Sequence, residues 1–151
     1  RHFLPATVTD GRRNDTRNLI EEMKTAGYTY VSTGTELSAV NLASTNKLLG
    51  LFNASDLNYD LDRVKKSINE PSLADMTKAA IQVLSRNQNG YFLMVEGGRI
   101  DHALHGTNAK RALEDTLAFD DAIKAAVGAV DLSNTLIIVT ADHDHVMAFN
   151  G

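Results

Sequence analysis

The chain has 151 residues, of which 43% are hydrophobic and 23% are charged, a composition typical of a soluble globular protein with one core. The formal net charge of -4 predicts no nucleic-acid binding, and no apolar run is long enough to cross a bilayer. We expect a single compact unit over residues 1–151. Because cysteine is absent, any transition metal must be bound by His, Asp or Glu.

The first elements are predicted from caps and β-rich residues. A helix is expected to begin in the polar cluster 14–16, whose side chains can accept hydrogen bonds from free N–H groups, and to end near Gly27. Residues 28–32 are aromatic or β-branched for the most part and predict a strand. A short helix is expected over residues 42–49.

Two longer helices are predicted further along the chain. Ser72, followed three positions later by Asp75, resembles a capping box that opens a helix. Its expected apolar face is Met76, Ala80, Val83 and Leu84. A second helix is expected over residues 108–130. Its expected apolar face is Ala112, Thr116, Phe119, Ile123 and Val127.

Two short apolar runs flank the second helix and predict the fold. Residues 91–95 and 136–140 are continuous and β-rich, as expected for central strands covered on both faces. Strand, helix and strand form a βαβ unit, which predicts an α/β fold with a mostly parallel central sheet and flanking helices. Ligands gather at the carboxyl ends of such strands, where Glu96 and Asp142-His143 follow directly.

Acidic and imidazole side chains after these runs predict a metal site. Asp101 and His105 share one helix face if their segment is helical, and Asp142 and His143 follow the second run. Each pair alone is more often a solvated surface, and only their joint position after two predicted strands favours metal binding.

The sequences of these segments resemble a known family. Residues 95–102, Val-Glu-Gly-Gly-Arg-Ile-Asp-His, and residues 140–145, Thr-Ala-Asp-His-Asp-His, are similar to the two metal-binding motifs of alkaline phosphatases. Residues 49–52 and 70–73 resemble intervening segments of that family. The form of the first motif is similar to the vertebrate and marine bacterial branch. The resemblance extends from about residue 14 to residue 151 and implies a middle-to-late fragment of a longer enzyme.

This resemblance implies a set of metal ligands. Glu96 matches a magnesium ligand of the family. Asp101 and His105 match two ligands of one zinc ion, and Asp142 and His143 match two ligands of a second zinc ion. The intact enzyme would therefore bind two zinc ions and one magnesium ion.

The resemblance also implies supporting roles. His102 occupies a position that contacts bound phosphate in the family, and His145 matches a histidine that supports a zinc-bound carboxylate. A calcium site in the vertebrate branch would use the positions of Phe52 and Glu70. Asn53 replaces a glutamate of that site, so calcium is doubtful.

The implied activity is phosphomonoester hydrolysis through a serine nucleophile. The family's serine lies in an Asp-Ser-Ala segment, and no Asp-Ser pair occurs in this chain, so we expect the isolated chain to be inactive. The family resemblance also implies a homodimer for the intact enzyme and a periplasmic or extracellular location. Two alternatives stay open: a related hydrolase or mutase such as a sulfatase or phosphodiesterase, and a non-catalytic metal-binding fragment. Elsewhere, Asp115 is expected on a solvated helix face and Phe92 in the core.

Overall fold

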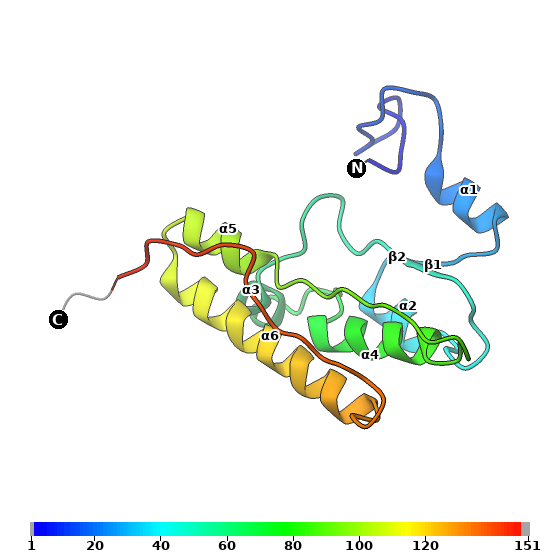
Figure 1. Ribbon diagram of the computed structural model, residues 1–151. Coiled ribbons are helices and arrows are strands. Elements are labelled where there is room, and N and C mark those ends of the chain that lie inside the picture. Colours follow the sequence, from blue (N-terminus) through cyan, green and yellow to red (C-terminus); the bar gives the residue numbers. More distant parts are fainter. Residues whose placement is uncertain (1, 149–151) are drawn as a thin grey trace.

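The computed structural model describes residues 2–148 and has an α/β fold with a small parallel sheet (Figure 1). Strand β1, Thr29–Val31, pairs with β2, Leu48–Gly50, so that Thr29 lies opposite Leu48 and Val31 opposite Gly50. Helix α2, Gly34–Ala39, lies between the two strands in the chain. The predicted α/β class and the predicted strand over residues 28–32 are confirmed.

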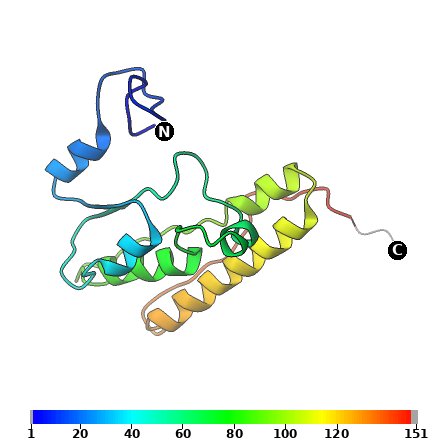
Figure 2. The same ribbon diagram turned by 180° about the vertical axis from the view of Figure 1, so that it is seen from behind.

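The N-terminal third differs from the prediction in two places. Helix α1, Leu19–Thr25, begins after Asn18, whose side chain accepts hydrogen bonds from two backbone N–H groups, so the cap lies two residues beyond the expected cluster. The short helix predicted over residues 42–49 is wrong, because the end of that segment is strand β2. Residues of this segment pair with β1, as in the bonds from Thr29 N to Lys47 O and from Leu51 N to Val31 O, and this pairing satisfies backbone groups that a helix would have satisfied internally. Both views show α1 standing apart from the other helices (Figure 1, Figure 2).

A small apolar core joins the sheet to a long helix. Val31, Leu37 and Ala79 are buried together, and Phe52 and Met76 are among the half-buried residues that pack against them. The buried residues come from β1, α2 and helix α4, Leu73–Leu84, and Phe52 lies in the loop that follows β2. The core therefore fixes the sheet on one face of α4.

Both long helices begin where the sequence predicts. Ser72 forms a complete capping box with Asp75 at the start of α4. The side chain of Asn108 accepts a hydrogen bond from the N–H of Arg111 at the start of helix α6, Ala109–Ala129. Helix α4 packs along α6 (Figure 1). The buried positions are Thr77, Ala79 and Ile81 in α4 and Ala112, Asp115 and Ala122 in α6. Of these only Ala112 belongs to an expected apolar face, so the rest of both faces differs from the prediction.

The two apolar runs predicted as central strands are not strands in the part of the chain that the structure describes. Phe92, Leu136 and Ile138 are 89%, 83% and 76% exposed, so the expectation that Phe92 belongs to the core is also wrong. A strand needs a neighbour to satisfy its N–H and C=O groups, and neither run has a backbone partner among residues 2–148. The expected metal-binding residues therefore follow unpaired segments rather than strands of the sheet.

Two short helices complete the framework of the site. Helix α3, Asp60–Lys65, and helix α5, Arg99–His105, both pack against α6. The residues after α6 run back beside it towards α5 (Figure 1, Figure 2). Within residues 2–148, no helix combines the length and the hydropathy needed to span a membrane.

Candidate metal centre

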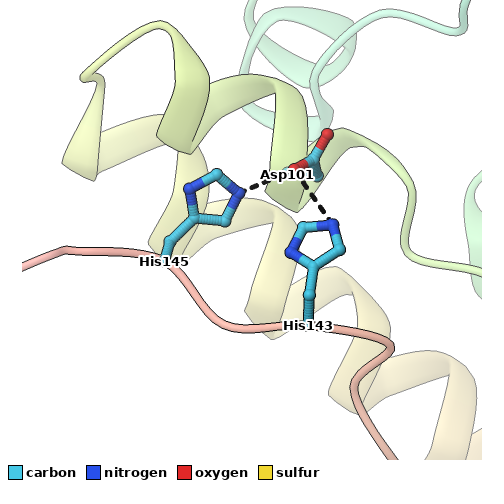
Figure 3. Close-up of side chains that lie close together, drawn as sticks. All are labelled: Asp101, His143 and His145. Carbon is cyan, nitrogen blue, oxygen red and sulfur yellow. Dashed lines mark hydrogen bonds and ion pairs between the residues drawn. The ribbon is translucent and has the colours of Figure 1, made fainter.

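Asp101, in the first turn of α5, lies at the centre of three imidazoles. Its Oδ1 atom is 2.6 Å from Nε2 of His145, 3.3 Å from Nε2 of His105 and 3.6 Å from Nε2 of His143. Figure 3 shows the His143 and His145 rings turned towards Asp101. One carboxylate thus joins residues that are up to 44 positions apart in the sequence.

The local backbone explains why these side chains meet. Asp101 and His105 are one helical turn apart, so both project from one face of α5. His143 and His145 are two positions apart on the non-helical C-terminal segment, and both rings face Asp101 (Figure 3). Ring contacts tie the two groups together, because the His145 ring lies 4.8 Å from the ring of His105 and 5.3 Å from that of His143.

Hydrogen bonds assign different roles to the two C-terminal histidines. Nδ1 of His143 is 3.1 Å from the carbonyl oxygen of Asp144. Because a carbonyl can only accept, Nδ1 donates, and the neutral ring keeps its lone pair on Nε2, the atom nearest Asp101. This bond, with the charge of Asp142, raises the pKa of His143.

His145 is the more enclosed of the two, since its side chain is 18% exposed. Its Nε2 donates to the Asp101 carboxylate at 2.6 Å, which lowers the pKa of Asp101 and keeps that group anionic. An outer imidazole that donates to a ligating carboxylate orients it for a metal. This arrangement fits His145 as the support of Asp101.

The donor set and its spacing fit a transition metal. The ligand atoms of Asp101, His143 and His145 all lie within 4.8 Å of one another. Donor atoms around one tetrahedral zinc ion, each about 2.0–2.2 Å from it, lie roughly 3.3–3.6 Å apart. The donor atoms of this group are therefore close enough to belong to one metal centre.

Three other predicted residues are not part of the group formed by Asp101, His143 and His145. The Asp142 side chain is 88% exposed, and its Oδ2 atom is 3.6 Å from Nε2 of His143. The Glu96 side chain lies close to Gly98: a Cβ atom added to Gly98 would be 3.2 Å from Glu96 Oε1. Glu96 does not belong to the group of Asp101, His143 and His145. His102 contacts Arg99 instead of the cluster, with 2.8 Å between Nη1 and Nδ1.

The residues predicted for calcium are arranged differently from an oxygen cage. Glu70 is buried and accepts hydrogen bonds from Nδ2 of Asn53 at 2.7 Å and from both the backbone N and Nδ2 of Asn58 at 2.9 Å. Calcium prefers oxygen ligands, whereas these three contacts are N–H donors that satisfy the carboxylate without a cation. Phe52 packs against the core. The calcium site stays a prediction that this geometry does not support.

Two residues near the centre were not predicted from the sequence. Asp115 is buried rather than solvated, and its carboxylate accepts from the backbone N of Asp60. It lies on the same helix face as Ala112, three positions earlier, which is the only signal that the sequence offers. Arg99 lies inside the first motif, where its charge alone gave no role.

Comparisons with known proteins agree on one family. The model of the alkaline phosphatase family matches residues 1–151. The membrane-bound alkaline phosphatase of Bombyx mori is 46% identical over 162 aligned residues, which cover all of this chain and 29% of that protein. The alkaline phosphatase of Gadus morhua is 42% identical and is matched over all of this chain and 34% of its own length.

Solved structures give the same result. The crystal structure of Thermus thermophilus alkaline phosphatase superposes with a TM-score of 0.73 at 36% identity, over 78% of this chain and 24% of that one. The chain thus spans about a third or less of the length of these relatives. The match over the whole sequence and the likeness in structure lead to one conclusion: the chain belongs to the alkaline phosphatase family.

Proposed function

We propose that this chain contributes part of the metal centre of a phosphomonoester hydrolase. The observation that carries the proposal is the convergence of Asp101 with His105, His143 and His145 in a chain of this family. Carboxylate and imidazole groups are suitable zinc ligands, and a chain without cysteine has no thiolate to offer in their place.

The residues divide between three ions in this proposal. Asp101 and His105 bind one zinc ion, Asp142 and His143 bind a second, and Glu96 binds magnesium. Two zinc ions at such a site stabilise negative charge on the attacking and leaving oxygens of a transferring phosphoryl group. The raised pKa of His143 means that a proton competes with the metal for Nε2, so binding should strengthen as pH rises.

Two histidines act around the ions. His145 donates to Asp101 and holds its carboxylate in one orientation. His102 lies one position after Asp101 in α5 and would contact the phosphate group. Neither residue needs to bind a metal for these roles.

Zinc titration calorimetry of the 151-residue chain tests the ligand assignment. With two protein ligands for each zinc ion, we expect weak binding, which Asp101→Asn or His143→Ala reduces by at least about tenfold. His2→Ala is the matched control, because His2 lies in an N-terminal turn outside the cluster. Equal losses in all three variants would refute the assignment.

A chromogenic phosphomonoester tests the activity. We expect no sustained turnover by the 151-residue chain with added zinc and magnesium, because it contains no Asp-Ser pair to supply the family's nucleophile. A preparation of a longer polypeptide of this family that includes the chain should hydrolyse phosphomonoesters in preference to sulfate esters and phosphodiesters. A preference for sulfate esters would favour the related-hydrolase alternative, and continued inactivity would favour the non-catalytic metal-binding one. For that whole protein we also propose a homodimer and a location outside the cytoplasm.

A further inference from the structure

Arg99, the first residue of α5, connects His102 to the loop that precedes α3. Its Nη1 atom lies 2.8 Å from Nδ1 of His102 and 3.5 Å from Oδ2 of Asp56. Its guanidinium carbon lies 3.9 Å from the centre of the Tyr59 ring. We propose that Arg99 is a positioning residue that orients the His102 imidazole, and that Tyr59 holds the guanidinium in place.

The contact between Arg99 and His102 has only one possible direction. A guanidinium carries donors and no acceptor, so Nδ1 of His102 must accept. The neutral imidazole then carries its proton on Nε2. His102 therefore presents an N–H donor on the side of the ring away from Arg99, which suits an anionic oxygen.

Tyr59 gives the guanidinium a fixed position. The guanidinium of Arg111, in α6, also lies near the Tyr59 ring, at 4.8 Å from its centre. Arg111 is itself held by Asp62 of α3, with 2.9 Å between Nη2 and Oδ2. The Tyr59 ring is therefore close to the guanidinium groups of both Arg99 in α5 and Arg111 in α6. A cation over an aromatic face is attracted by the ring's charge distribution.

The environment of the Arg99 Nε atom makes the ring contact more important. Nε of Arg99 is buried and has no hydrogen-bond partner within residues 2–148. The orientation of the guanidinium therefore depends on its face, which stacks on Tyr59, and on Nη1. A lysine cannot replace it, because an ammonium has no planar face that could stack on the Tyr59 ring.

The biological role of this contact rests on the proposed function, because an oriented N–H donor at His102 is useful only where a phosphate group binds. Its test does not depend on that function. The contacts exist without a metal or substrate, so they can be measured on the metal-free chain. Loss of zinc binding would affect the proposed function and leave the measurement below unchanged.

Nuclear magnetic resonance of the ¹⁵N-labelled metal-free chain tests the contact. The spectra are recorded at about pH 8.5, where a free imidazole is neutral. We expect a scalar coupling across the hydrogen bond from Arg99 Nη1 to an unprotonated His102 Nδ1. The coupling should persist in Tyr59→Phe, which keeps the ring, and disappear in Tyr59→Leu and Arg99→Lys.

Arg86→Lys is the matched control, because Arg86 binds backbone carbonyls of Ala43 and Thr45 and does not contact α5. It should leave the His102 signals unchanged. A role in folding alone would make Tyr59→Leu lower the melting temperature without selective change at His102. Absence of the coupling in the unmodified chain would overturn the proposal even if a variant fails to fold. Persistence in Tyr59→Leu would overturn the part assigned to Tyr59.

Discussion

Asp115 offers a sharp test of the packing between α3 and α6. Its carboxylate is buried on α6 and accepts from the backbone N of Asp60 at 3.3 Å. Burial raises its pKa from the usual 3.8 to about 6. The hydrogen bond from the Asp60 backbone and the charge of Arg99 oppose this rise, whereas the negative charges of Asp60 and Asp62 add to it. The folded protein therefore holds a proton on Asp115 that the unfolded chain releases at lower pH.

The sign of the pH dependence follows from this difference. Between pH 3.8 and about 6 the folded state binds more protons than the unfolded state, so the contribution of Asp115 to stability falls as pH rises. A shift of roughly two units corresponds to about 3 kcal/mol, and screening by water near the surface lowers this to about 1–3 kcal/mol. Replacing the carboxyl by a neutral amide should remove that cost above pH 6.

Urea unfolding followed by circular dichroism measures the effect in Asp115→Asn. At each pH, the unfolding free energy of the unmodified chain is subtracted from that of the variant. This difference should be about 1–3 kcal/mol larger at pH 8 than at pH 4. Any constant cost of burying the amide cancels in this comparison. Asp121→Asn, on the exposed side of the same helix, should show a difference below about 0.5 kcal/mol. A pH-independent effect of Asp115→Asn would refute the reasoning.

Other substitutions test local features. Ser72→Ala removes the α4 cap and should cost about 1 kcal/mol in urea unfolding. Gly50→Ala should destabilise the protein by roughly 1–3 kcal/mol, because the new Cβ would lie 2.6 Å from the Phe52 ring. Gly128→Ala, in open space on α6, should stabilise it by up to about 1 kcal/mol. Equal melting temperatures of the two variants would contradict both predictions. Phe92→Lys should lower the fluorescence of a bound hydrophobic dye, since Phe92 is exposed, and unchanged dye binding would place the exposed apolar surface elsewhere.

The helices with polar caps could be predicted from sequence because caps act locally. Ser72 and Asn108 accept hydrogen bonds from N–H groups only three residues away, so their signal survives whatever the rest of the chain does. Asp101 and His105 share a helix face for the same local reason. These predictions needed no knowledge of tertiary neighbours.

Features that depend on distant partners could not be predicted in this way. The apolar runs 91–95 and 136–140 have the composition of buried strands, yet a strand forms only beside another strand. Residues 48 and 49, which were predicted to end a helix, lie in strand β2 because they pair with β1. Asp115 reads as a solvated acid until α3 covers it. Composition therefore predicted the class of the fold but not which segments pair.

The candidate metal centre combines both kinds of feature, and this has a consequence for binding. Asp101 and His105 are held by a helix packed on α6, whereas His143 and His145 lie on a segment without regular secondary structure. A metal that joins the two halves must offset the conformational entropy lost when that segment is fixed. The 2.6 Å contact between His145 and Asp101 already fixes part of it before any ion binds. Removing His145 should therefore weaken metal binding even though His145 need not be a ligand.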